Sequence, residues 1–244
     1  MLMDKLNEII NTNDQSSIKY VISHFIKNHL KDIPDMSIDY IAHACHTSKS
    51  QVSKYVQNLG YETMKDFKFA CKDNASGIER TTKPTLSLQN NIIENYISFS
   101  NGITKSIKHT LEYLNTDQLI KLIVDFQKSK RIFIYAHGHA RSLCSYIQNE
   151  LSLKHKEVII CDVDFSLDYH FEKRDLLLII SINGDTFHFE KRVIHHILKY
   201  SINTWLLSCK KDIEFNKNYL YVPVDDPIYN DYILRHVIDF ILRY

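Results

Sequence analysis

The stretch Asp175-Leu-Leu-Leu-Ile-Ile-Ser-Ile-Asn-Gly-Asp-Thr186 joins an unbroken apolar run to a polar segment that contains a glycine. Residues 176–180 are apolar on both faces of an extended strand, which is typical of a strand buried inside a parallel sheet. Residues 181–186 then supply hydroxyls and turn-forming residues where the chain leaves that strand. The stretch therefore predicts a central strand that opens, at its carboxyl end, into a loop and then a helix.

Four further segments have the same short and mostly apolar character, namely residues 131–136, 157–161, 203–208 and 219–224. Helical patterns precede or separate them, at residues 92–114, 116–130, 142–154, 186–200 and 228–243. Strands that are apolar on both faces and alternate with helices indicate a parallel sheet covered on both sides. We therefore predict an α/β domain with a five-stranded parallel sheet and helices on both faces.

Residues 1–73 show helical patterns only. Within this region Ser37 and Ser48 stand where the N-cap residues of two short helices belong, and Gly60 stands where the second helix ends. A tight turn around His46 joins the two helices. Two short helices connected in this way predict an all-α helix-turn-helix domain.

The second helix of this pair has a side rich in hydrogen-bond donors. Ala42 is small enough for a close helix crossing and Val52 can anchor the second helix in the core, so the opposite side faces solvent. We expect that side to contact DNA through Ser48, Lys49, Ser50, Gln51, Ser53, Lys54 and Gln57. Residues 46–72 hold five lysines against two acidic residues, so positive charge gathers where phosphates would lie.

On this side Gln51 has the amide that pairs with adenine, and Lys49 or Lys54 can meet guanine or a phosphate. The same pattern also fits a plain helical bundle whose lysines are merely solvated. Periodicity alone leaves both interpretations open.

A polar stretch with Gly77 and Pro84 follows the helical region. Helical periodicity fails there, which is typical of a boundary between domains. We predict domains at residues 1–73 and 88–244, with a linker at residues 74–87.

Two of the five glycines follow predicted strands. Gly138 comes after residues 131–136, and Gly184 comes after residues 176–180. In an open α/β sheet ligands bind at these carboxyl ends, where loops lead into helix N-termini that favour anions. On spacing alone residues 181–186 fit a capped turn equally well.

The run from Ser37 to Tyr61, with its continuation through Lys68, resembles the DNA-binding domain of RpiR/MurR-type bacterial transcription regulators. The residues that carry the resemblance are Ser48, Gln51, Val52, Lys54, Tyr55, Leu59, Gly60, Tyr61, Phe67 and Lys68. Gln51 and Lys54 stand where the family usually has threonine and arginine, a departure that affects the operator sequence rather than the fold. The resemblance implies binding to a pseudo-palindromic operator in double-stranded DNA, and control of sugar or amino-sugar metabolism.

Residues 88–244 are similar to the flavodoxin-like sugar isomerase (SIS) domain of the same family. The family's second loop reads Ser-x-Ser-Gly-x-Thr, and here Asn183 replaces its middle serine. Its first loop reads Gly-x-Gly-x-Ser, and here Ala136 and Ala140 replace the first glycine and the serine. The resemblance implies that a phosphorylated sugar or a related small anion binds through His137, Gly138, His139, Ala140, Ser181, Asn183, Gly184, Asp185 and Thr186.

These departures weaken the implied anion site. Each lost hydroxyl removes a charge-assisted hydrogen bond worth about 1.5–3 kcal/mol. His137 and His139 flank Gly138 and can replace the lost donors, more strongly when they are protonated. A sensor of a sugar phosphate and a ligand-independent regulator with a vestigial sugar site both stay open.

Catalysis is a separate possibility, because sugar isomerase domains also occur in aldose–ketose isomerases. An isomerase needs a base beside the carbonyl. The residues of a suitable type are Glu150, His188, Glu190 and His236, and their spacing nominates none of them. We therefore expect a regulator without catalytic residues or a cofactor, and keep a phosphosugar isomerase as the alternative.

Metal binding is not indicated either. The pair His137-x-His139 fits no four-ligand zinc spacing, even when Asp162-x-Asp164 or His195-His196 is added. We expect no metal.

The chain has 244 residues, a net charge of +1 and five scattered cysteines without a C-x-x-C pair, as expected for reduced thiols. No signal-peptide pattern is present, and the longest apolar run, 176–180, is too short to span a bilayer. We expect a cytoplasmic protein with no membrane partner. The family resemblance implies a homodimer or homotetramer formed through the C-terminal domain.

Glycine is scarce, with five residues where average usage predicts about 17. Codon bias accounts for part of this scarcity. Gly102 falls inside the predicted helix 92–114, and the sequence gives no reason for it.

Overall fold

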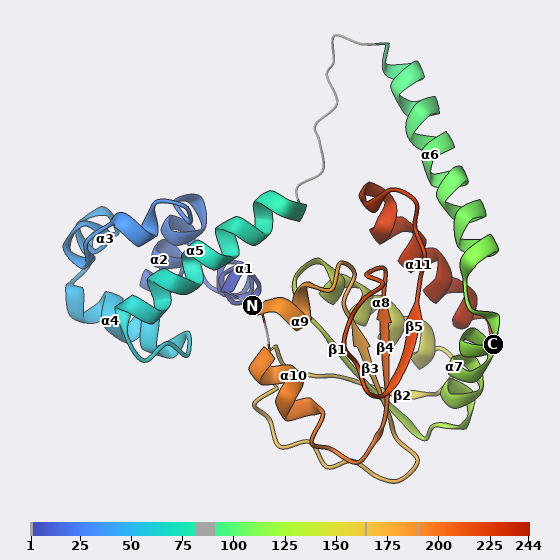
Figure 1. The fold of residues 1–244 in the computed structure, drawn as a ribbon. Helices are drawn as coiled ribbons and strands as arrows, with labels where there is room; N and C mark the ends of the chain where they lie inside the picture. The colour runs from blue at the N-terminus through green and yellow to red at the C-terminus, as the bar shows by residue number, and fades with distance from the viewer. Residues whose placement is uncertain (1, 82–90, 164, 190) are drawn as a thin grey trace. The chain divides into compact units, whose positions relative to one another are not determined.

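The computed structural model describes residues 2–81, 91–163, 165–189 and 191–244, with the side chains of residues 73, 76–81, 188, 189, 191 and 192 left aside. The chain divides into two compact units, Met1–Pro84 and Thr85–Tyr244 (Figure 1). Each unit has its own core, and each is described by itself.

The first unit is helical, as predicted. Its elements are α1 (Leu2–Thr12), α2 (Ile18–Asn28), the 3-10 turn η1 (Ile33–Asp35), α3 (Ile38–Ala44), α4 (Lys49–Asn58) and α5 (Met64–Thr81). Leu6, Ile26, Ile41 and Phe67 are fully buried in its core. Ala42 and Val52 are buried as well, so α3 and α4 meet through the two residues expected to allow their close packing.

The predicted helix boundaries of α3 and α4 are confirmed by their caps. The Ser37 and Ser48 hydroxyls accept hydrogen bonds from the third residue after each, at 3.1 and 3.2 Å. Gly60 has a φ of 91°, and its N–H donates to the Gln57 carbonyl at 2.8 Å. The N–H of the next residue, Tyr61, donates to the Val56 carbonyl at 3.3 Å. These two hydrogen bonds form the Schellman motif that ends α4.

The turn between α3 and α4 ends α3 in the same way but without a glycine. His46 has a φ of 50°, its N–H donates to the His43 carbonyl at 3.1 Å, and the Thr47 N–H donates to the Ala42 carbonyl at 2.9 Å. A residue with a Cβ loses about 1–2 kcal/mol in this left-handed conformation. The helix-turn-helix turn therefore stores backbone strain at His46.

The first part of the predicted linker at 74–87 is helical. Helix α5 continues through Thr81, so residues 74–81 are helical, while residues 82–87 lie outside the described part of the chain. The helix continues because Cys71 and Ala75, one turn apart, are both buried in the helical core. Ala75 is small and lies among polar residues, so the sequence pattern concealed this contact.

The second unit is built on a parallel sheet, and the predicted α/β fold is confirmed. The strands are β1 (Arg131–Ala136), β2 (Glu157–Ile160), β3 (Leu176–Ile180), β4 (Asn203–Ser208) and β5 (Asn218–Tyr221). Their order in the sheet is β2-β1-β3-β4-β5, and every neighbouring pair is parallel. All five residues of β3 are buried, so the stretch that predicts the central strand indeed forms it.

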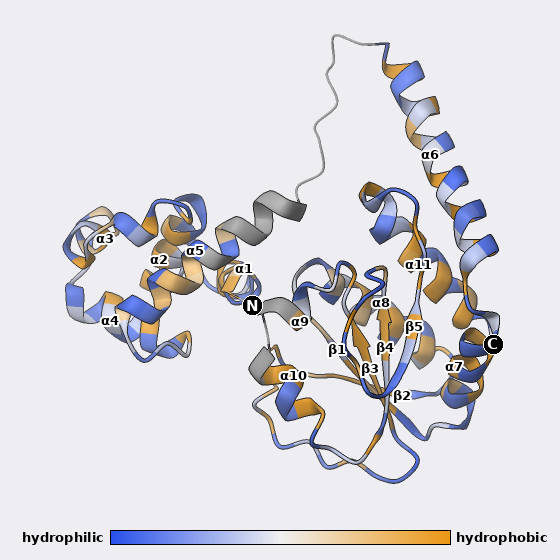
Figure 2. Ribbon diagram, viewed as in Figure 1, coloured by the Kyte–Doolittle hydropathy of each residue, from blue (hydrophilic) through white to orange (hydrophobic). Residues whose placement is uncertain are grey.

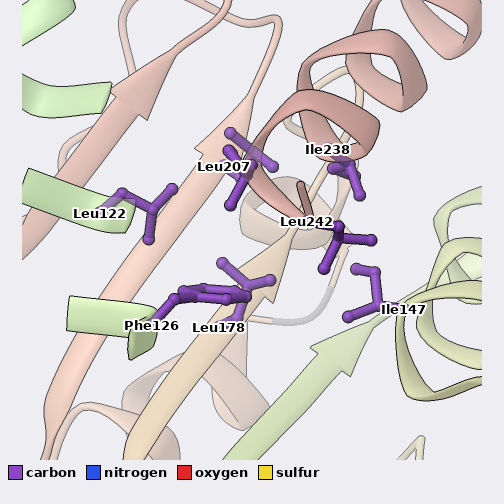
Figure 3. Close-up of a pocket in the computed structure, with 8 residues that line it drawn as sticks. Leu122, Phe126, Ile147, Leu178, Leu207, Ile238 and Leu242 are labelled. Atoms are coloured by element: carbon purple, nitrogen blue, oxygen red, sulfur yellow. The ribbon is translucent and has the colours of Figure 1, made fainter. Parts of the chain in front are cut away.

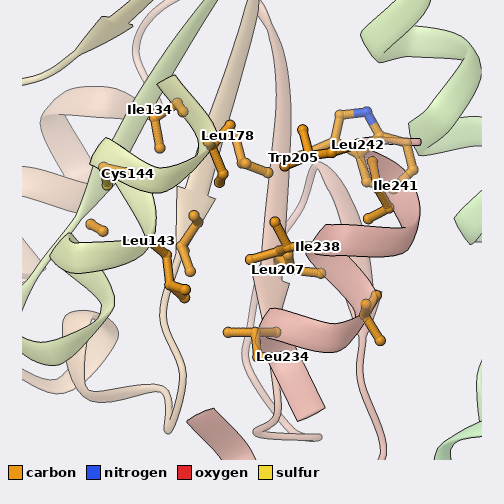
Figure 4. Close-up of a cluster of buried hydrophobic side chains, with 14 of the residues drawn as sticks. Ile134, Leu143, Cys144, Leu178, Trp205, Leu207, Leu234, Ile238, Ile241 and Leu242 are labelled. Atoms are coloured by element: carbon orange, nitrogen blue, oxygen red, sulfur yellow. The ribbon is translucent and has the colours of Figure 1, made fainter. Parts of the chain in front are cut away.

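Helices cover both faces of this sheet. They are α6 (Ile92–Tyr113), α7 (Thr116–Lys128), η2 (Gly138–Ala140), α8 (Arg141–Ser152), α9 (Asp185–Phe189), α10 (Lys191–Ile197), η3 (Pro227–Tyr229) and α11 (Asn230–Ile241). One face packs Leu178, Trp205 and Leu207 against α7, α8 and α11 (Figure 4). The other face packs aromatic residues such as Phe133 and Phe165 towards α10. The strands are accordingly among the most apolar segments in Figure 2.

One feature of this unit bears on where a ligand can bind. A gap of about 10 Å³ lies inside the core, between β3, β4 and the helices α7, α8 and α11 (Figure 3). Its lining is entirely apolar: Leu122, Phe126, Ile147, Leu178, Leu207, Ile238, Ile241 and Leu242. It is a packing gap of roughly the size of one water and has no group that would hold an anion.

Helix α6 rests on the segment around η3 through Gly102. A Cβ at Gly102 would overlap the phenol of Tyr229, so only glycine permits this approach. The structure thus explains why a glycine lies inside this helix. None of the helices in the described ranges combines the length and apolar character that a membrane span requires.

The strained turn gives a first prediction. His46→Gly should raise the stability of the helical unit by about 1 kcal/mol, because glycine adopts a positive φ without steric cost. Thermal unfolding followed by circular dichroism measures the change. The matched control, His43→Gly, puts the same substitution inside α3 and should lower stability by about 0.5–1 kcal/mol. Destabilisation by both variants would contradict the strain at His46.

Candidate functional site

The predicted DNA-binding residues form one side of α4 and its cap. Ser48, Lys49, Ser50, Gln51, Lys54 and Gln57 are exposed, and Ser53 is half-buried. Val52, Tyr55 and Val56 are buried on the opposite side. The structure thus presents to solvent a surface of hydroxyl, amide and ammonium donors on a helix that is fixed from behind.

Lys49 is not free on this surface. Its ammonium lies 2.5 Å from a carboxylate oxygen of Asp39 on α3, and both side chains are 61% exposed. An exposed ion pair is worth at most about 1 kcal/mol, so a DNA phosphate can displace Asp39. Among the described residues Lys54 has no ion-pair partner, which makes it the more available cation of the two.

A buried hydrogen bond holds α4 in place. The Tyr55 hydroxyl lies 2.5 Å from that of Ser23 on α2, and both residues are buried. Because the Ser23 hydroxyl donates to the Lys19 carbonyl at 2.7 Å, Tyr55 is the donor in the bond to Ser23. Burial raises the pKa of Tyr55 to about 12, so the phenol stays protonated. The sequence did not predict this hydrogen bond, because Ser23 lies 32 positions away.

The two predicted ligand loops are brought together at one edge of the sheet. Ala136, the last residue of β1, pairs with Ile180, the last residue of β3. From this pair the strand order runs to β2 on one side and to β4 and β5 on the other. Ligands of open α/β sheets bind at such a switch point, outside the carboxyl ends of the strands.

In the second loop the hydroxyls turn inwards. Ser181 and Thr186 are each 2% exposed, and the Ser181 hydroxyl accepts a hydrogen bond from the Thr186 N–H at 3.3 Å. The capped turn is thus formed. Gly184 has a φ of 80°, and a Cβ there would come within 3.0 Å of the Lys210 side chain.

The exposed polar side chain of this loop is Asn183. Its Oδ1 accepts a hydrogen bond from Nδ2 of Asn230, at the start of α11, at 2.7 Å. Asp185 is half-buried and has a polar partner of its own.

The first loop has fewer side-chain donors. Gly138 has a φ of 59°, and a Cβ there would meet nothing within 4 Å, so the space above it is open. His139 is exposed, and His137 is half-buried and interacts with another residue. Ala140 is 3% exposed and packs into the core, so a serine hydroxyl at that position would also be buried.

Two cations stand beside these loops that the sequence interpretation missed. Arg141 begins α8 directly after the first loop and donates to the Cys161 carbonyl at 3.1 Å. Lys210 follows β4, and its stem lies against Gly184. The signal that was available is position, because both residues come just after the carboxyl end of a strand or its loop.

Of the residues weighed as a catalytic base, the two whose side chains are described, Glu150 and His236, lie away from the loops. Glu150 lies about 13 Å along α8 from its first residue, and His236 about 9 Å along α11. The side chains of His188 and Glu190 lie outside the described part of the structure, as does Asp164 of the weighed metal set. Among the side chains that are described, no group of His, Cys, Asp or Glu is arranged to hold a metal ion.

Known proteins are similar to this chain in sequence and in fold. No protein-family model matches the sequence. The HTH-type transcriptional regulator GlvR of Bacillus subtilis (strain 168) is 25% identical over 181 residues, covering 72% of this chain and 63% of that protein. The chain therefore spans less than two thirds of the length of the curated relative it matches.

Among solved structures, the NanR protein of Vibrio vulnificus complexed with ManNAc-6P matches with a TM-score of 0.52 and 15% identity, over 100% of this chain and 90% of that chain. The sugar isomerase domain of an RpiR transcription factor from Sphaerobacter thermophilus covers 59% of this chain and 86% of its own, with 11% identity and a TM-score of 0.43.

The chain thus joins a helical unit that contains a helix-turn-helix to an α/β unit with a five-stranded parallel sheet. It is similar in sequence to GlvR, an HTH-type transcriptional regulator, and similar in fold to NanR.

The bond behind α4 gives a second prediction. Tyr55→Phe should lower the stability of the helical unit by about 1 kcal/mol, because the Ser23 oxygen loses its buried donor. The midpoint of urea unfolding, followed by circular dichroism, reports this loss. Tyr40→Phe removes a hydroxyl from an exposed tyrosine of α3 and is the matched control, with no expected change. Equal midpoints for the two variants would show that the bond contributes nothing.

Proposed function

We propose that this protein is a DNA-binding transcriptional regulator of sugar or amino-sugar metabolism, and that its α/β domain binds a phosphorylated sugar or a related anion without catalysing a reaction. The observation that carries the proposal is the outward donor surface of α4 in a chain that also carries two glycine-containing loops at a switch point. The similarity to GlvR, which is named as a transcriptional regulator, supports it.

In the DNA-bound protein, α4 lies in the major groove. The Gln51 amide has the donor and acceptor that pair with adenine, and the Lys54 ammonium neutralises a phosphate. Lys49 exchanges Asp39 for a second phosphate. Each phosphate contact releases counterions, so affinity falls as salt rises.

In the effector-bound protein, the anion lies over the two loops. Open space above Gly138, the exposed amide of Asn183 and the cations Arg141 and Lys210 support this placement. NanR was solved with ManNAc-6P, and we propose a ligand of the same chemical class for this chain.

We also propose that the protein works in the cytoplasm as a homodimer or homotetramer on a pseudo-palindromic operator. Ile92, Ile93, Tyr96 and Ile97 support an interface on the first half of α6, because all four are more than half exposed. Exposed apolar groups gathered in this way are typical of protein contacts. Two copies would place two α4 helices about one helical turn of DNA apart.

The DNA contact gives a third prediction, which compares two substitutions on α4. Lys54→Ala should weaken binding to all sequences and lower the salt slope by about one, because it removes one phosphate contact. Gln51→Ala should instead relax base preference at one position of the site. Salt-dependent fluorescence anisotropy and selection from a random DNA library measure the two effects.

The control for this comparison is Lys19→Ala, which removes a lysine from α2 rather than from α4. It should leave both affinity and salt slope unchanged. An unchanged base preference in Gln51→Ala would show that another element reads the sequence, and an absence of specific binding by the wild-type protein would refute the regulator.

The effector gives a fourth prediction. In a panel of phosphorylated sugars that includes ManNAc-6P, at least one member should raise the unfolding temperature of the α/β domain. At one hundred times its Kd a ligand adds about 2.7 kcal/mol to stability, which corresponds to several degrees. The unphosphorylated sugars are the controls.

Two outcomes of this screen would contradict the proposal. No stabilisation by any member, with DNA binding intact, would favour the ligand-independent regulator. Conversion of a sugar phosphate into its isomer, followed by a coupled assay, would make the protein an isomerase.

A further inference from the structure

Asn230 lies beside the carboxyl ends of two neighbouring strands, β3 and β4. It is 8% exposed, and its Nδ2 donates to Oδ1 of Asn183 in the second loop at 2.7 Å. Its own carbonyl accepts a weak hydrogen bond from Sγ of Cys209, after β4, at 3.7 Å. A single buried residue thus connects α11 to the second loop.

This bond sets the polarity that Asn183 presents to a ligand. With Oδ1 occupied by Asn230, the remaining polar atom of the exposed amide is Nδ2, which only donates. Within the described part of the chain Nδ2 of Asn183 has no partner. An anion binds to hydrogen-bond donors. Asn183, which replaces the expected serine, supplies such a donor because Asn230 holds its amide in this orientation.

The segment that leads into Asn230, residues 225–229, also packs against helix α6. Tyr229 precedes Asn230 and lies against Gly102, and the Phe99 ring is 5.7 Å from that of Tyr229. Just before η3, the Asp225 carboxylate pairs with Lys105 of α6 at 2.9 Å. Helix α6 follows residues 82–90, which lead from α5 of the helix-turn-helix domain.

We propose that Asn230 is a positioning residue that orients the Asn183 amide with its N–H groups towards a bound anion and ties this loop, through Tyr229, to helix α6. Signalling from α6 to DNA rests on the proposed function. The tie between the loop and α6 does not, because it is formed by contacts within the α/β domain itself.

Hydrogen–deuterium exchange of the full-length, ligand-free protein tests the tie. Asn230→Ala should speed amide exchange roughly fivefold both in residues 181–187 and in residues 92–105 of α6, because one net hydrogen bond is lost. Asn183→Ala removes the same bond from the exposed side and should have the same effect, even if Asn230→Ala fails to fold.

The chain offers a matched control in a second pair of asparagines. Asn218 donates to Asn203 at 2.9 Å, at the amino ends of β5 and β4. Asn218→Ala therefore removes the same kind of bond far from the carboxyl edge. It should leave exchange in both segments unchanged.

Asn230→Asp separates the tie from the orientation. A carboxylate only accepts, so the Asn183 amide would reverse, donate to Asp, and turn its oxygen towards the ligand. Exchange in α6 should stay within about twofold of the wild type, since a hydrogen bond is still present. Binding of inorganic phosphate should weaken by about tenfold or more, since a donor has become an acceptor.

Two results would overturn the proposal. One is amide exchange in α6 that stays at the wild-type rate in both Asn230→Ala and Asn183→Ala. The other is an affinity of Asn230→Asp for phosphate that equals that of the wild type. A wild-type protein that binds neither phosphate nor DNA would refute the proposed function and the orientation of Asn183 towards an anion. The exchange comparison would still decide whether Asn230 ties the loop to α6.

Discussion

Burial of β3 on both faces is the constraint on which the α/β domain depends. Its five residues are at most 1% exposed, so β3 offers no polar group along its length. Chemistry is therefore confined to its ends. At the amino end burial acts to raise the pKa of Asp175, but hydrogen bonds from Arg131 and the Glu172 N–H outweigh it and hold that pKa below its ordinary value. At the carboxyl end the chain opens into the loop that carries Asn183.

Scarcity of glycine shapes both halves of the molecule. The chain keeps glycine at the end of α4 and in the two switch-point loops, where Gly60, Gly138 and Gly184 all have a positive φ. At two other helix ends it accepts strain instead, since His46 and His155 have φ values of 50° and 58°. Glycine is thus retained in the elements to which we assign DNA and ligand recognition, while the turn before α4 is formed at an energetic cost.

The sequence predicted what local patterns determine and missed what distant contacts determine. The strands, the caps at Ser37 and Ser48 and the outward side of α4 follow from periodicity over a few residues. Asn230 contacts Asn183 from 47 positions away, and no local pattern reveals such a pair. The sequence also could not decide whether the Ser181 hydroxyl points inwards or towards a ligand, because a capped turn and an anion-binding loop use the same residue types.

Under the proposed function, ligand binding to the α/β domain and DNA binding by the helix-turn-helix domain are energetically coupled. The most direct measurement is the affinity of the full-length protein for its operator, with and without a saturating sugar phosphate that stabilises it. Linkage requires the operator to change the affinity for the sugar phosphate by the same factor. We expect equal shifts of about fivefold or more in both titrations. Operator affinity that is identical with and without the ligand would show that the two domains are not coupled.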